Sequence, residues 1–267
     1  MYDDIYRRRE VDAVLAAFVP PELADPEVAA LGGNGFLLRD DLERIEATLR
    51  SAIRPRGCGA PLIVELGCGA GGLARRMARR LPASILGLDV SPAAIEVARR
   101  AEPNEASSAE ARFEVAEFAR TGLSSNVADA VVSVDALYLA DPPHAALVEA
   151  RRILRSDGTL LMTAYTSEVH YPGSVRLQRD FRPLIEAAGF VLERSLDLTS
   201  TWRTVMRAQH RRRWEQRDAI RAQLGDRAER DLHISAAMIG ADGRPSYLDQ
   251  VERIELCARA IHEPVAP

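Results

Sequence analysis

The chain has 267 residues, 47% of them apolar, which is enough for a substantial hydrophobic core in one large domain or in a domain with an added cap. A formal net charge of -4 gives no reason to expect a nucleic-acid partner, and no apolar run is long enough to suggest a membrane span or a signal peptide. Cys58, Cys68 and Cys257 fit neither a disulfide framework nor a zinc site, so we expect a cytoplasmic protein without structural zinc and predict no metal-binding residues.

From residue 61 onward, short apolar runs alternate with longer amphipathic stretches, as in parallel strands joined by crossover helices. Ser91 and Pro92 are typical of a helix start, Gly189 of a helix end, and the SDG at 156–158 of a turn into a strand. The predicted fold is α/β, with a Rossmann-like, seven-stranded, mostly parallel sheet covered by helices on both faces. Its expected strands are 61–66, 84–89, 111–116, 129–134, 158–165, 190–198 and 251–260.

Two regions fall outside this alternation. Residues 1–50 are interpreted as a helical N-terminal cap, and residues 199–250 as a helical, arginine-rich insertion before the last strand. They leave a core of residues 51–198, to which residues 251–267 add the last strand and a tail. Because segments at the rim of a scaffold commonly carry specificity, we expect these two regions to form the substrate pocket.

The first strand runs directly into a cluster of glycines, in the stretch LIVELGCGAGGL. The dinucleotide spacing G-x-G-x-x-G is met by Gly67, Gly69 and Gly72, and the spacing E-x-G-x-G-x-G by Glu65, Gly67, Gly69 and Gly71. Glycine permits dihedral angles that a side chain forbids and lets the backbone pass close to a ligand at the start of a helix. The sequence therefore predicts a nucleotide-binding loop.

Two carboxylates distinguish between the possible ligands. Asp89 ends the second strand, where it can accept hydrogen bonds from both hydroxyls of a ribose, or alternatively cap the helix at Ser91. Glu65 lies where a carboxylate would repel a pyrophosphate but attract an ammonium group such as that of S-adenosylmethionine. A solvated or helix-capping Glu65 is the alternative.

The segments VELGCGAGG and LGLDVSPAAIEVARR resemble the first two motifs of class I S-adenosylmethionine-dependent methyltransferases. FEVAEF resembles the third strand of this family, and SVDALYLADPPHAALVEARRILRSDGTLLMTAY resembles the fourth strand, helix and fifth strand of its small-molecule branch, the ubiquinone- and sarcosine-methylating type. The resemblance covers roughly residues 60–198. It implies methyl transfer by in-line displacement to a small organic acceptor, which we expect to belong to specialised metabolism. Oxygen or nitrogen is favoured over carbon because those chemistries need fewer special residues.

The resemblance also implies roles for individual residues. It places Glu117 near the adenine amino group, Phe118 beside the ring, and Asp135 beside the methionyl part of the cofactor or the acceptor, although an Asx turn is an alternative for Asp135. Glu117 stands where an aspartate is more common, and Tyr138 stands where this branch often has histidine. The predicted cofactor contacts are Glu65, Gly67, Gly69, Gly71, Asp89, Val90, Glu117, Phe118, Asp135 and Tyr6.

Several side chains are candidates for the acceptor site. Tyr138 either orients an acceptor or packs half in the core, and His170 and Tyr171 follow the fifth strand, with His170 as the candidate base. Tyr6 is a candidate lid over the cofactor sulfonium, or part of an ordinary helix stripe. Trp202 is either pocket wall or core. Catalytic roles are predicted for His170, Tyr138 and Asp135, and substrate contacts for Tyr138, His170, Tyr171 and Trp202.

Two other functions are compatible with the same loop. The first is an NAD(P)-dependent oxidoreductase that uses the dinucleotide spacing, against which Glu65 argues. The second is a non-catalytic subunit that keeps the methyltransferase fold. The predicted partner is a small-molecule methyl acceptor, without nucleic acid or membrane, and a homodimer is allowed.

Overall fold

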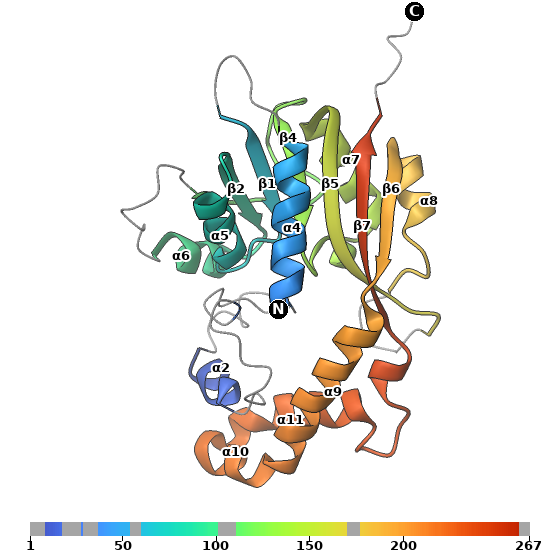
Figure 1. Ribbon diagram of the computed structural model, residues 1–267. Coiled ribbons are helices and arrows are strands. Elements are labelled where there is room, and N and C mark those ends of the chain that lie inside the picture. The colour runs from blue at the N-terminus through green and yellow to red at the C-terminus, as the bar shows by residue number, and fades with distance from the viewer. Residues whose placement is uncertain are drawn as a thin grey trace, which may run out of the picture.

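The computed structural model describes residues 9–17, 28, 37–53, 60–100, 111–169 and 177–261. Its centre is a seven-stranded sheet in the order β3-β2-β1-β4-β5-β7-β6 (Figure 1). Strands β1 to β5 pair in parallel, and β7 runs antiparallel to both β5 and β6. The strands are β1 (Leu62–Leu66), β2 (Ser84–Asp89), β3 (Ala111–Val115), β4 (Ala128–Ser133), β5 (Leu154–Thr166), β6 (Phe190–Asp197) and β7 (Glu252–Ala260).

The predicted α/β sheet is confirmed, with a difference at the start of β5. This strand begins at Leu154 rather than at residue 158. Its pairing with β4 shifts between Ala128 and Ala130, which lie opposite Leu154 and Thr159. Asp157 in the extra residues has φ +61°. The SDG segment is therefore a bulge inside the strand, not a turn before it.

Helices cover both faces of the sheet. On one face, α4 (Arg39–Ala52), α5 (Gly72–Arg80) and α6 (Pro92–Arg100) share an apolar core with side chains such as Ile63 and Ile85. On the other face, α7 (Pro143–Ile153) and α8 (Arg182–Ala187) pack with Val64 and Leu86. Consecutive residues of a strand point to opposite faces, so neighbouring apolar residues of β1 supply both cores. The expected boundary of the cap at residue 50 falls inside α4, which packs on the sheet face.

A helical layer lies beyond the carboxyl ends of the parallel strands (Figure 1). It consists of α9 (Thr199–Glu215), α10 (Arg217–Leu224) and α11 (Glu229–Ile239), which connect β6 to β7. The N-terminal α2 (Arg9–Ala16) packs on α10, where its Val11 and Leu15 join the apolar cluster of Ile220 and Leu224. In the ranges given above, no helix is long and apolar enough to cross a bilayer.

Candidate active site

The predicted glycine loop joins β1 to α5 at the carboxyl edge of the sheet. Gly67, Gly69 and Gly71 have φ angles of +80°, +52° and +76°, a region that residues with a side chain rarely adopt. An ideal Cβ on Gly67 would lie 2.3 Å from the Cβ of Ala136, and one on Gly71 would lie 2.5 Å from the Phe113 ring. At these two positions a side chain would therefore collide with the protein's own side chains, so glycine is required.

Glu65 is a buried carboxylate with an unused oxygen. The residue is 3% exposed and accepts a hydrogen bond from the backbone N–H of Ala74 in α5. Its Oε2 atom has no partner in the part of the chain that the structure describes. Burial, and then the nearby charge of Asp89, raise the pKa of Glu65 to about 8. Because a buried polar atom without a partner is costly, this position favours a ligand that brings a positively charged donor.

Asp89 ties the glycine loop to the end of β2. Its Oδ2 accepts a hydrogen bond from the backbone N–H of Gly69 at 2.9 Å, and its Oδ1 accepts one from the N–H of Ser91 at 2.9 Å. The predicted cap at Ser91 is also present, since the Ser91 hydroxyl accepts a bond from the N–H of Ala94. Asp89 therefore holds the glycine loop against the end of β2.

The predicted adenine side of the cleft is partly apolar and exposed. Val90 is 40% exposed, and Val115, which the sequence did not single out, is 50% exposed at the end of β3. Phe118 is half-buried, with its ring 3.4 Å from the Cβ position at Gly67. Glu117 is exposed and forms a surface ion pair with Arg120. A flat ring placed here would cover apolar surface that water otherwise contacts.

Asp135 follows β4 and has φ +50°. Its side chain is 4% exposed and accepts hydrogen bonds on both oxygens. Oδ1 receives the Thr163 hydroxyl at 2.7 Å and Nε of Arg253 at 3.2 Å. Oδ2 receives the Tyr165 hydroxyl and Nη2 of Arg253, each at 3.3 Å. These donors occupy the lone pairs that a general base would need, so the geometry favours a positioning role.

Of the residues predicted to contact the acceptor, the structure describes only Tyr138 and Trp202. Tyr138, in the short helix Leu137–Leu139, is half-buried with its ring 5.3 Å from that of Tyr165. Trp202, on α9, is 2% exposed and packs against Leu248 and Val251, so it belongs to a core cluster. The other three predicted contacts, Tyr6, His170 and Tyr171, lie outside the described residues.

Sequence reasoning missed the residues around Asp135. Arg253 is 1% exposed, ion-pairs with Asp135 and reaches Asp41 of α4 at 3.5 Å. It lies opposite Tyr165 in the pairing of β5 with β7. The sequence feature that could have indicated this ion pair is an arginine inside the expected strand 251–260. A charged side chain buried in a sheet requires a partner of opposite charge.

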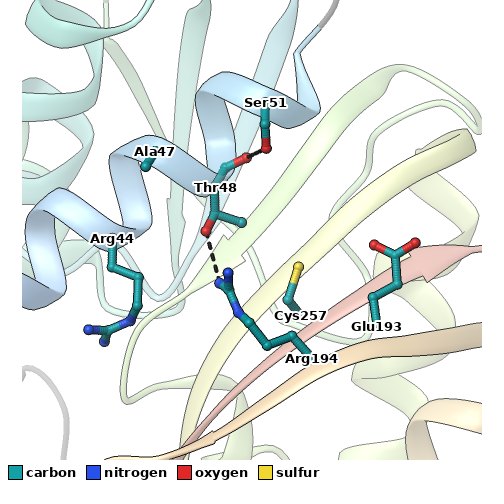
Figure 2. A pocket seen from close by; sticks show the side chains of 7 residues that line it. All are labelled: Arg44, Ala47, Thr48, Ser51, Glu193, Arg194 and Cys257. Carbon is teal, nitrogen blue, oxygen red and sulfur yellow. Dashed lines mark hydrogen bonds between the residues drawn. The ribbon is translucent and has the colours of Figure 1, made fainter.

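A separate pocket of about 400 Å³ lies between α4 and strands β6 and β7 (Figure 2). Its Arg44 and Arg194 both donate to Glu255, which is fully buried, so their charges are already compensated. No residue of the glycine loop lines it. The lining residues are Arg44, Ala47, Thr48, Ser51, Glu193, Arg194 and Cys257.

The strand order, the antiparallel β7 and the glycine loop after β1 define the fold of a class I methyltransferase. Residues 64–162 match the protein family described as "Methyltransferase domain".

Curated and solved proteins agree with this assignment. The 4-amino-L-phenylalanine/4-methylamino-L-phenylalanine methyltransferase of Streptomyces pristinaespiralis is 43% identical over 65 residues, which span 24% of this chain and only 20% of that relative. The solved structure of the cyclase SpnF superposes with a TM-score of 0.64 at 21% identity, over 86% of this chain and 85% of that one.

A second solved structure is phosphoethanolamine N-methyltransferase 2 of Haemonchus contortus, in complex with phosphomonomethylethanolamine and S-adenosylhomocysteine. It has a TM-score of 0.65 and 16% identity, over 87% of this chain and 56% of that one. At these identities the likeness to both solved structures is one of fold.

Proposed function

We propose that the protein transfers the methyl group of S-adenosylmethionine to nitrogen or oxygen of a small organic acceptor in specialised metabolism. The observation that carries this proposal is the buried Oε2 of Glu65, which has no partner in the described chain, beside the glycine loop. An ammonium group would give this oxygen a charged donor. A diphosphate there would instead meet the charge of Asp89 and the buried carboxyl group of Glu65, which disfavours the NAD(P)-dependent alternative.

The residues of the cleft fit the parts of the cofactor. Glu65 would hold the amino group, Asp89 the ribose hydroxyls, and Val90, Val115 and Phe118 the adenine ring. The glycine loop would line the path between them with backbone amides at the start of α5. Glu117, which is exposed, would reach only the outer edge of the ring.

When bound, S-adenosylmethionine supplies a methyl group activated by a sulfonium, and in-line displacement by the acceptor leaves S-adenosylhomocysteine and a proton. The chain has to align the acceptor and to exclude water from the cleft. The loop after β4 contributes to alignment, since it contacts the glycine loop through Ala136. The helical layer above the carboxyl edge would close the acceptor side.

The acceptor class is supported by the side chains at this edge. Tyr138 and Tyr165 are half-buried there and offer ring surface together with a hydroxyl group. The partial relative from Streptomyces pristinaespiralis acts, by its name, on an aromatic amino acid that carries an amino substituent. Cytoplasmic location, with Cys68 and Cys257 as free thiols, and a homodimer remain part of this proposal.

Calorimetric titration of the full chain with S-adenosylhomocysteine and, separately, with NAD tests the proposal. We expect binding of S-adenosylhomocysteine and none of NAD. Binding of NAD alone would reverse the assignment. Binding of S-adenosylhomocysteine without methyl transfer from labelled cofactor to any acceptor would favour the non-catalytic alternative.

A further inference from the structure

Three aromatic side chains meet at the carboxyl edge of β5. The rings of Tyr138 and Tyr165 are 5.3 Å apart and nearly perpendicular, at 83°. On the other side, Tyr165 packs on Trp202 of α9, with 5.1 Å between ring centroids. Trp202 is buried, whereas Tyr138 and Tyr165 keep part of their surface exposed. Tyr165 is thus held between a core residue and a residue of the loop after β4.

The hydroxyl group of Tyr165 has a defined direction. It donates a hydrogen bond to Oδ2 of Asp135 at 3.3 Å. Burial, and then the charge of Asp135, raise the pKa of Tyr165 well above its usual value. The phenol therefore stays protonated near neutral pH, with its proton directed to Asp135. Its oxygen retains lone pairs that can accept a hydrogen bond from another molecule.

Asp135 is itself held in place by buried donors. Arg253 donates to both of its oxygens, and Thr163 adds a third bond. Arg253 also pairs with Asp41 of α4, so it links three segments that are far apart in the sequence. A planar guanidinium that forms two parallel bonds fixes the orientation of a carboxylate better than one contact does.

This arrangement adjoins the cofactor cleft. The Cβ of Ala136, the residue after Asp135, would lie 2.3 Å from a Cβ on Gly67. The loop that carries Asp135 therefore touches the glycine loop. A group bound at the Tyr165 oxygen would lie at the end of the cleft where we place the methionyl part of the cofactor.

We propose that Tyr165 orients the methyl acceptor by accepting a hydrogen bond from the N–H or O–H group to be methylated, while Asp135 and Arg253 position Tyr165. This inference rests on the proposed function. The nitrogen or oxygen that donates this hydrogen bond still has a lone pair, and the bond fixes the direction in which this lone pair points. It can then point at the methyl carbon. The neighbouring ring of Tyr138 suits an acceptor whose amine or hydroxyl is carried on an aromatic ring. A carbon acceptor would have no donor for this bond.

The first test compares Tyr165→Phe with Tyr247→Phe in the full chain. Tyr247 packs against the same apolar cluster as Tyr165 but lies in the short helix Tyr247–Asp249 before β7, so it is the control. The probe acceptors are 4-amino-L-phenylalanine and L-tyrosine, with labelled S-adenosylmethionine. For the probe that the wild type methylates, we expect Tyr165→Phe to lower kcat/KM about 10- to 100-fold through loss of one hydrogen bond, with unchanged affinity for S-adenosylhomocysteine. Tyr247→Phe should match the wild type, and equal turnover by Tyr165→Phe would overturn the proposal.

The second test needs no acceptor and measures phenolate absorbance against pH. The wild type should show a tyrosine that ionises late, and Tyr165→Phe should lack it. Asp135→Asn should move that ionisation to lower pH, and Arg253→Lys should also change it, because both alter the charge and bonding around the phenol. An ionisation at the same pH in Asp135→Asn and wild type would overturn the positioning role. If instead the proposed methyltransferase function were wrong, the wild type would not bind S-adenosylhomocysteine.

Discussion

At the scale of single residues, the cleft is organised by two buried carboxylates. Glu65 and Asp89 lie on neighbouring strands, and each accepts a bond from a backbone N–H, of Ala74 and Gly69 respectively. Burial, and then the nearby charge of Asp89, raise the pKa of Glu65 and keep it protonated near neutral pH in the free protein. A cationic ligand counteracts this effect, so binding and protonation of Glu65 should be coupled.

The first prediction is that S-adenosylhomocysteine releases a proton when it binds. The pKa of Glu65, about 8 in the free protein, should fall when an ammonium group lies beside it. Binding at pH 7 should then release up to about one proton, and affinity should increase as pH rises toward 8. Calorimetry in buffers of different ionisation enthalpy measures the release. Heats independent of the buffer would contradict it, and Glu65→Gln should abolish the dependence.

The second prediction concerns Asp89→Asn. Loss of a carboxylate oxygen should weaken S-adenosylhomocysteine binding by about 1 to 3 kcal/mol, because a ribose hydroxyl or the N–H of Gly69 loses its acceptor. The control is Asp129→Asn. Asp129 is also buried and accepts a bond from a backbone N–H, that of Leu62, but at the opposite end of β1. Equal affinities of Asp89→Asn and the control would remove Asp89 from the ribose site.

At the scale of secondary-structure elements, buried apolar runs made the strands predictable. The runs of β1, β2 and β4 are almost wholly buried, because parallel strands covered on both faces have no polar side, whereas β3 and β6 at the edges of the sheet are partly exposed. The early start of β5 was not predictable. Ser156, Asp157 and Gly158 are typical of turns, and only the pairing with β4 shows that the strand continues through them.

The third prediction concerns the pH dependence of stability, which follows from a buried histidine between α9 and α11. His210 is 4% exposed, its Nδ1 lies 3.1 Å from the Ser235 hydroxyl, and its Nε2 has no partner among the residues of the described ranges. Burial, and then the charge of Arg213, lower the pKa of His210 from 6.5 to about 4. The unfolded chain then binds more protons between these values. The free energy of unfolding should therefore be largest above pH 6.5 and fall by up to roughly 3 kcal/mol as pH decreases through 4.

Urea unfolding as a function of pH tests this prediction. His210→Met removes the titrating group, so its unfolding free energy should depend less on pH in this window. His233→Gln is the control, since His233 lies on α11 but is exposed. If His210→Met kept the pH dependence of the wild type, the loss of stability in acid would have to come from other groups.

At the scale of the whole molecule, the decisive contacts join distant parts of the chain. Asp135 and Arg253 are 118 positions apart, and Asp41 and Arg253 are 212 apart. The glycine motif and Asp89 could be found from sequence because one local unit, β1, its loop, α5 and β2, places them. The pairing of Asp135 with Arg253 could not, because it depends on β7 lying next to β5 in the sheet. The contact of α2 with α10 likewise exists only in the assembled fold.

The central claim is that the glycine loop holds S-adenosylmethionine by its amino group and its ribose. A crystal structure of the full chain with S-adenosylhomocysteine tests it most directly. We expect density for the ligand amine within hydrogen-bond distance of Oε2 of Glu65, with both ribose hydroxyls on Asp89. Density for adenosine elsewhere, or for a diphosphate against the loop after soaking with NAD, would contradict it.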